Sequence, residues 1–135
     1  MIVGTGNVGA SIAFSLINQR TAVNEMVLVD INADDAEGEA MDLRDALAVA
    51  PSYLKIKSGT YKDAKGCDII VITAGANQKP GETRLDLLKK NSSIFRPMIK
   101  EIMANHTLAL KFLLRSDTYT CHFYLGFLGK LQDQA

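Results

Sequence analysis

Three glycines near the start of the chain have a spacing that can hold a phosphate group. They lie in the segment Gly4-Thr5-Gly6-Asn7-Val8-Gly9, directly after a short apolar run at 2–3. Gly4 permits a sharp turn from a strand into a helix, Gly6 lets the main chain approach a pyrophosphate, and Gly9 lets the new helix pack closely on the sheet. The free N–H groups at the start of that helix would then face the phosphates.

A carboxylate at the end of the second apolar run makes this glycine turn more informative. The run 25–29 is followed directly by Asp30. In a dinucleotide-binding unit, an acidic residue there accepts hydrogen bonds from both hydroxyls of the adenosine ribose, and it repels a 2′-phosphate. No arginine lies between Asp30 and Asp35 to pair with such a phosphate. The two features together predict a site for NAD rather than NADP.

The elements that must position these residues alternate along the chain, which predicts a doubly wound α/β fold with a parallel sheet. Apolar runs predict strands at 2–3, 25–30, 54–58 and 67–74. The last of these is apolar throughout, so we expect it to be buried on both faces. Helical periodicity, separated by Gly- and Pro-containing turns, predicts helices at 8–19, 34–50 and 83–105, with a loop at 76–82.

Finer features of the helices can also be predicted. Apolar periodicity places Phe14 of the first helix and Met41 of the second toward the sheet. Thr83 is a candidate N-cap for the third helix. Pro97 lies inside that helix, where it removes a backbone hydrogen bond and clashes with the preceding turn, so we expect a kink near 93–96.

Composition narrows the classes of function. The 135 residues, of which 47% are hydrophobic, suffice for one domain with a core. Fifteen basic and fifteen acidic residues cancel, which leaves no charge excess to attract nucleic acid or an anionic membrane. Cys67 and Cys121 are too far apart in sequence to indicate a zinc site or a disulfide framework. The uncharged first segment has no basic region before it, so we expect a cytoplasmic protein without a signal peptide.

Residues 2–105 resemble the nucleotide-binding half of bacterial L-lactate dehydrogenases, within the lactate/malate dehydrogenase family. The matching passages are V-G-T-G-N-V-G-A-S-I-A-F, L-V-D-I-N, G-E-A-M-D-L-R-D-A-L and the long A-G-A-N-Q-K-P-G-E-T-R-L-D-L. The resemblance implies a Rossmann-like fold and hydride transfer between NADH and pyruvate or lactate. It also implies that full-length relatives are homo-oligomers, without deciding the state of this chain.

The resemblance assigns two residues to the substrate. Arg84 matches the family's catalytic arginine, which a mobile lid brings to the substrate carbonyl, where it stabilises the charge developing on oxygen. Gln78 matches the position that separates lactate from malate dehydrogenases, because the malate enzymes carry an arginine there for the second carboxylate of oxaloacetate. Malate dehydrogenase therefore remains the alternative within the family, and Gln78 favours the lactate enzyme.

The resemblance also implies the cofactor contacts. Val8 would lie beside the pyrophosphate, Tyr61 on the adenine side, and Gly75-Ala76 at the nicotinamide end. The full expected cofactor site is Gly4, Gly6, Asn7, Val8, Gly9, Asp30, Tyr61, Gly75 and Ala76. Two positions depart from the family: many relatives carry a lysine where Asp35 stands, and a small polar residue where Pro97 stands. We therefore expect weakened affinity for NAD.

The family pattern ends near Asn105. The family's proton donor, the carboxylate that orients it and a second arginine lie in A-T-N-P, L-D-x-x-R-x-R and E-H-G-D segments, none of which occurs here. Neither His106 nor His122 has the context of an acid/base. We therefore expect an incomplete NAD-binding domain at 1–105, lacking the catalytic substrate domain, and a tail at 106–135 from a shifted reading frame, a truncated gene or a disrupted paralogue.

Alternatives stay open both for the structure of the tail and for the function of the whole chain. Residues 108–114 are apolar enough to pair as a fifth strand, although Lys111 favours an edge strand or a helix. For the whole chain we expect either an L-lactate dehydrogenase by descent that is inactive alone, or a non-catalytic module that binds NAD, or an unstable fragment without function.

Overall fold

Strands and helices alternate along the chain, as the sequence predicts. The computed structural model describes residues 1–19, 22–77, 79–105, 111–114 and 124–127. The elements are β1 (Ile2–Val3), α1 (Asn7–Ile17), β2 (Glu25–Val29), α2 (Ala33–Ala46), β3 (Lys55–Ser58), the 3₁₀ helix η1 (Tyr61–Ala64), β4 (Ile69–Ile72), α3 (Arg84–Asn105), β5 (Lys111–Leu114) and β6 (Tyr124–Phe127).

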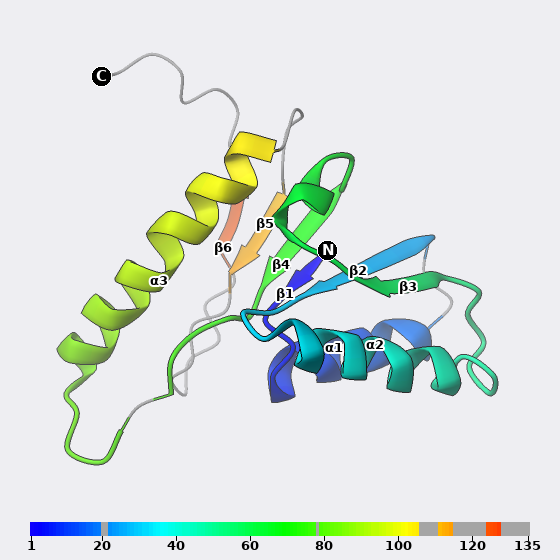
Figure 1. Cartoon of the computed structure of the whole chain (residues 1–135), viewed down its shortest axis with the longest axis horizontal. Coiled ribbons are helices and arrows are strands. Elements are labelled where there is room, and N and C mark those ends of the chain that lie inside the picture. The colour runs from blue at the N-terminus through cyan, green and yellow to red at the C-terminus, as the bar shows by residue number, and fades with distance from the viewer. Residues whose placement is uncertain (20–21, 78, 106–110, 115–123, 128–135) are drawn as a thin grey trace.

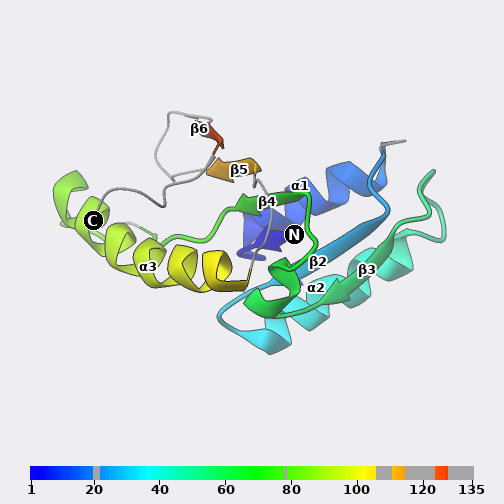
Figure 2. The same ribbon diagram turned by 90° about the horizontal axis from the view of Figure 1, so that it is seen from above.

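The described strands form one sheet in the order β3-β2-β1-β4-β5-β6. Every neighbouring pair is parallel except β5 and β6, which are antiparallel. Figures 1 and 2 show β3 and β6 at the two ends of the sheet. The strand order reverses between β1 and β4, and in open α/β sheets ligands bind at the carboxyl ends of the strands at such a point. The predicted Rossmann-like fold is confirmed.

Two cores cover the two faces of this sheet. On one face, Ile2 of β1 packs with Ala13 and Ile17 of α1 and with Leu43 of α2. On the other, the next residue, Val3, packs in a cluster that includes residues of η1 and α3. Successive side chains of a strand point to opposite faces, so both clusters follow from the alternation along β1. Figure 1 shows α1 and α2 together on one side of the strands, with α3 apart from them.

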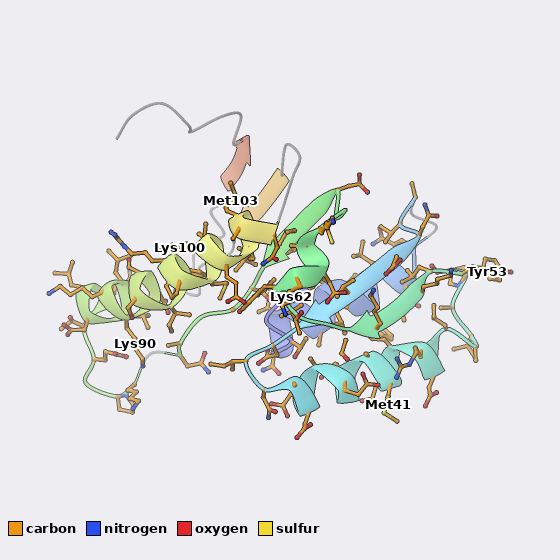
Figure 3. The ribbon with its side chains drawn as sticks, turned by 45° about the horizontal axis from the view of Figure 1, so that its top comes forward. Met41, Tyr53, Lys62, Lys90, Lys100 and Met103 are labelled. Atoms are coloured by element: carbon orange, nitrogen blue, oxygen red, sulfur yellow. The ribbon has the colours of Figure 1, made fainter. Side chains whose placement is uncertain are left out.

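The predicted inward positions of Phe14 and Met41 are wrong. Phe14 is 53% exposed and Met41 is 54% exposed, while their neighbours Ala13 and Ala40 are fully buried. Adjacent helical residues point about 100° apart, so a helix that buries Ala13 turns Phe14 away from the sheet. Figure 3 shows Met41 pointing away from the sheet, on the outer side of α2.

The expectation that β4 is buried on both faces is also wrong at its start. Ile69 is 51% exposed, whereas Ile70 and Ile72 are fully buried. Val71 shares the face of Ile69 and packs against the α1 and α2 core. That core reaches Val71 and not Ile69, so the apolar side chain at the beginning of the strand stays open to solvent.

The capping prediction for α3 is confirmed. The Thr83 hydroxyl accepts a hydrogen bond from the Asp86 N–H at 3.2 Å, and the Asp86 carboxylate accepts one from the Thr83 N–H at 3.3 Å. α3 continues through Pro97 as one helix, and the kink expected near 93–96 stays a prediction. Pro97 is exposed, so water can reach the carbonyl of Ser93, which loses its helical partner there. No helix in the described part of the chain is long and apolar enough to cross a membrane.

The open prediction of a fifth strand in 108–114 is confirmed for 111–114, which form β5 beside β4, and the alternatives of an edge strand or a helix at Lys111 are wrong. Lys111 is the first residue of β5, where it lies opposite Ile69 in the parallel register with β4. The strand is interior in the sheet, because β6 pairs with its other edge. The apolar residues 112–114 form the rest of the strand, so the lysine stands at its start rather than in its middle.

The short helix η1 was not predicted, since four residues are too few to show a period. Asp63 stabilises its start: its Oδ2 accepts from the Thr60 N–H at 2.9 Å and from the Thr60 hydroxyl at 3.4 Å. Lys57 Nζ lies 3.4 Å from the other carboxylate oxygen. The backbone hydrogen bond from Thr60 is the largest cause of the lowered pKa of Asp63, and Lys57 adds to it.

Asp63→Ala should therefore destabilise the chain at neutral pH by about 1 kcal/mol, the typical value of a helix cap. Because the folded-state pKa is lowered, the stabilising effect is present above the unfolded pKa of about 3.9 and is lost as the pH falls through the folded value. Urea denaturation of wild type and variant at pH 7 and at about pH 3.5 tests this. The difference in free energy of unfolding should narrow at the lower pH, and a constant difference would rule out a charged Asp63 as its source.

Candidate functional site

A pocket of about 380 Å³ lies at the carboxyl ends of β1, β2 and β4. Its lining joins four segments that are far apart in sequence: the end of β1 with the glycine turn, Asp30 with Ile31, Tyr61 of η1, and the residues that follow β4. Eight of the nine predicted cofactor residues line it: Gly4, Gly6, Asn7, Val8, Gly9, Asp30, Tyr61 and Gly75. The fold therefore brings the predicted cofactor residues together at one site, at the point where the strand order reverses.

Two glycines of the turn are fixed by the backbone around them. Gly4 has a φ of +96°, and a Cβ there would lie 2.5 Å from the backbone nitrogen of Ala74. A Cβ on Gly9 would lie only 1.9 Å from the carbonyl oxygen of Gly4. Both contacts are with main chain, which cannot rotate aside as a side chain can. The absence of a Cβ at Gly4 and Gly9 therefore allows β1, α1 and the end of β4 to pack closely together.

Gly6 is different, because a Cβ there would have no atom within 4 Å. It precedes α1 and has an extended conformation with φ −64° that any residue can adopt. No acidic residue lies in the first turn of α1, and among the described residues no acceptor is found for the N–H groups of Asn7 and Val8. The open space beside Gly6 and these unpaired donors suit an anion such as a pyrophosphate.

Asp30 is held in place at the edge of this pocket. Its Oδ2 accepts from the Thr5 N–H at 2.7 Å and from the Thr5 hydroxyl at 3.2 Å, while Oδ1 accepts from the Asn32 N–H at 3.2 Å. The side chain is half-buried. Each carboxylate oxygen has two lone pairs, so Oδ1, which accepts only from Asn32, can still accept a hydrogen bond from a hydroxyl group of a ligand.

Tyr61 belongs both to the pocket and to the core. It lines the pocket and packs against the cluster of Val3 on the sheet face of α3. Burial is the main cause of its raised pKa, and the carboxylates of Glu101 and Asp30 add to it. The phenol therefore remains neutral at physiological pH, and its ring offers an apolar wall to a ligand.

The loop after β4 forms the far end of the pocket. Gly75 and Asn77 line it, whereas Ala76 does not. The Ala76 N–H donates to the Asn91 side chain of α3 at 2.9 Å. Thr73 closes the other side, where its hydroxyl donates to the carbonyl of Gly4 at 2.6 Å. The sequence patterns did not single out Thr73 or Asn91, because neither belongs to a recognised motif.

Arg84 lies outside this pocket lining. It is the exposed first residue of α3, and Figure 1 shows the loop before it running away from the sheet. Within the loop, Glu82 Oε2 accepts from the Lys79 N–H at 2.9 Å, and Glu82 Oε1 lies 3.9 Å from Lys90 Nζ. Figure 3 shows Lys90 on the side of α3 toward this loop. Gln78 lies outside the described residues.

A second hollow of about 550 Å³ adjoins the glycine turn on the α2 side. Its carboxylates are Asp30, Asp34, Asp35, Glu39 and Asp42. No lysine or arginine lines it. A 2′-phosphate on a ribose at Asp30 would meet this negative charge, which agrees with the sequence-based preference for NAD over NADP. No group of histidine, cysteine, aspartate and glutamate side chains suited to hold a metal ion occurs within the described ranges.

Comparison with known proteins agrees with this geometry. The family model described as lactate/malate dehydrogenase, NAD binding domain, matches residues 1–114. The match extends past Asn105 and includes β5. L-lactate dehydrogenase 2 of Bacillus cereus is 56% identical over 103 residues, which cover 76% of this chain and 32% of that protein. The chain thus spans about a third of the length of the curated relatives it matches.

Solved structures of the same family share the fold. A lactate dehydrogenase enzyme from a Medee basin deep-sea metagenome library is 49% identical with a TM-score of 0.76, over 84% of this chain and 36% of that one. Malate dehydrogenase from Archaeoglobus fulgidus, solved in complex with NADH, is 44% identical with a TM-score of 0.78, over 86% of this chain and 39% of that one. Both a lactate and a malate dehydrogenase are therefore among its structural relatives.

Proposed function

Since the chain belongs to the lactate/malate dehydrogenase family through its NAD-binding domain, we propose that the pocket at the glycine turn binds NAD(H). The observation that carries this proposal is the space beside Gly6, faced by the unpaired N–H groups that begin α1. The pyrophosphate fits there, Asp30 accepts from the adenosine ribose, and Tyr61 lies on the adenine side. Gly75 and Ala76 are at the nicotinamide end, where the bound cofactor supplies or accepts a hydride.

We propose further that the protein to which this domain belongs is an L-lactate dehydrogenase, acting on pyruvate and lactate. Arg84 would then stabilise the negative charge that develops on the substrate carbonyl oxygen. Gln78 supports pyruvate over oxaloacetate, because a neutral amide leaves a second carboxylate unpaired. In the present structure Arg84 is exposed, so the loop 76–83 must close for the arginine to reach a substrate at the nicotinamide.

A second candidate is a module that binds NAD(H) without catalysing its oxidation. It is favoured by the position of Arg84 outside the pocket. Assays of the purified chain separate the two. NADH oxidation with pyruvate supports the lactate enzyme, oxidation with oxaloacetate alone supports the malate enzyme, and saturable NADH binding without turnover supports the module.

Gly6→Ala should weaken NADH binding and leave the fold intact. The new methyl group enters the open space proposed for the pyrophosphate, and it meets no protein atom within 4 Å. We expect NADH affinity to fall by about tenfold or more, as for one lost charged contact, with the urea midpoint unchanged. Unchanged affinity in a folded Gly6→Ala chain would place the cofactor elsewhere.

A further inference from the structure

Asn91 is a polar side chain in an apolar position. The buried residues of α3 are Leu87, Asn91, Met98 and Ile102, and their spacing forms one stripe along the helix, of which Met98 and Ile102 pack in the core on the sheet. Asn91 is only 8% exposed. Burying an amide destabilises a fold unless the amide makes hydrogen bonds. If the position only packed against neighbouring residues, a leucine would therefore stabilise the fold more than an asparagine. The position of Asn91 therefore calls for an explanation other than packing.

The explanation lies in the loop at the end of the pocket. Asn91 Oδ1 accepts from the Ala76 N–H at 2.9 Å, in a contact between residues fifteen apart in sequence. An added Cβ on Gly75 would lie 3.7 Å from Oδ1 and 4.0 Å from Nδ2, so the amide is packed directly beneath Gly75. Within the described residues, Nδ2 donates to no acceptor. Oδ1 is therefore the atom of the Asn91 amide that makes a hydrogen bond, as the acceptor for the Ala76 N–H.

The same side chain lies on the helix that carries Arg84. Seven residues separate Arg84 from Asn91, which is two helical turns, so both lie on one side of α3 and about 10 Å apart along its axis. The last turns of α3 lie near η1, whereas its first turns extend beyond the sheet in Figure 1. Asn91 thus ties the middle of the helix to the loop that ends the pocket.

We propose that Asn91 is a positioning residue, which acts through the backbone of Gly75 and Ala76. By holding the Ala76 N–H, it fixes the position of the loop at the nicotinamide end of the pocket. This inference rests on the proposed function, since it assumes that the nicotinamide lies at Gly75. Asn91 itself touches neither the cofactor nor the substrate.

Three variants and a control test the proposal. Asn91→Leu keeps the size of the side chain and removes the acceptor, and Asn91→Asp keeps an oxygen at the same place. Asn91→Ala removes the acceptor without adding an apolar branch, and it replaces the leucine variant if that one does not fold. Ser93→Ala is the matched control, since the exposed Ser93 hydroxyl bonds only the Lys90 carbonyl of the same helix.

Two measurements are made on each folded variant: amide hydrogen exchange at Ala76 by NMR, and NADH affinity by titration. Asn91→Leu should raise the exchange rate of Ala76 and weaken NADH binding by roughly three- to tenfold, the effect of one hydrogen bond. Asn91→Asp should restore the protection of Ala76 and most of the affinity. Ser93→Ala should match the wild type in both.

The outcomes separate this inference from the proposed function. Absence of NADH binding by the wild-type chain contradicts the proposed function. If the wild type binds and Asn91→Leu binds equally well, only the positioning role of Asn91 is contradicted. The role is also contradicted if Asn91→Asp fails to restore Ala76 protection, because the loss in the leucine variant would then come from packing and not from the missing acceptor.

Discussion

Gly9→Ala is expected to destabilise the chain by about 3 kcal/mol or more, the upper part of the range for overpacked cores. The new Cβ would lie 1.9 Å from the Gly4 carbonyl oxygen and 2.9 Å from the Thr73 hydroxyl oxygen. The Gly4 carbonyl oxygen is a backbone atom and cannot rotate aside, because Gly4 has a positive φ and packs against the backbone of Ala74. Relief of the clash therefore requires α1 to move away from the sheet, which opens the core around Ala13 and Ile17.

The matched control is Gly38→Ala in α2. A Cβ at Gly38 meets no atom within 4 Å, and the residue lies in the interior of the helix. Alanine is favoured over glycine in such a position by about 1 kcal/mol, so this variant should be more stable than the wild type. Urea denaturation of both variants measures the contrast. A Gly9→Ala variant as stable as the wild type or more stable would show that the glycine turn is not packed as the structure has it.

Asp30→Asn is expected to weaken NADH binding by roughly tenfold to a hundredfold. The proposed ribose contact uses charge-assisted hydrogen bonds, each worth about 1.5–3 kcal/mol, and the amide keeps one oxygen in place of two. That remaining oxygen can still accept from the Thr5 N–H, so the turn should stay folded. Loss of the charge should also reduce the discrimination against NADPH, because a 2′-phosphate would meet less repulsion.

Asp34→Asn is the control for the general effect of charge. Asp34 lines the acidic hollow beside α2 but not the pocket at the glycine turn, and its side chain is exposed. Parallel titrations with NADH and NADPH should show wild-type affinity for NADH in this variant. If the two substitutions weaken NADH binding equally, Asp30 does not contact the ribose, and the effect comes from the field of the acidic cluster alone.

Sequence patterns predicted the parts of the fold that short-range chemistry determines. The spacing of the glycines, the apolar strands and the Thr83 cap each depend on neighbours within a few residues, and the structure has them where expected. The pocket could be predicted as well, because parallel strands end at a common edge. Its residues come from the ends of β1, β2 and β4 and from η1.

The remaining features depend on contacts that no local pattern contains. Phe14 and Ile69 are apolar, and whether they are buried depends on how far α1 and α2 reach across the sheet. Asn91 looks like an ordinary polar residue until its partner, the Ala76 N–H, is known. The exposed position of Arg84 is likewise set by the path of a loop, to which the sequence assigns no single conformation.

The most direct test of this account is a titration of the chain with NADH, followed by the fluorescence of the nicotinamide. The chain contains no tryptophan, so protein emission interferes little with the signal. The pocket at Gly6 and Asp30 predicts saturable binding of one NADH per chain, which Gly6→Ala abolishes or weakens at least tenfold in a folded protein. Saturable binding that Gly6→Ala leaves unchanged, or no saturation at millimolar NADH, would contradict it.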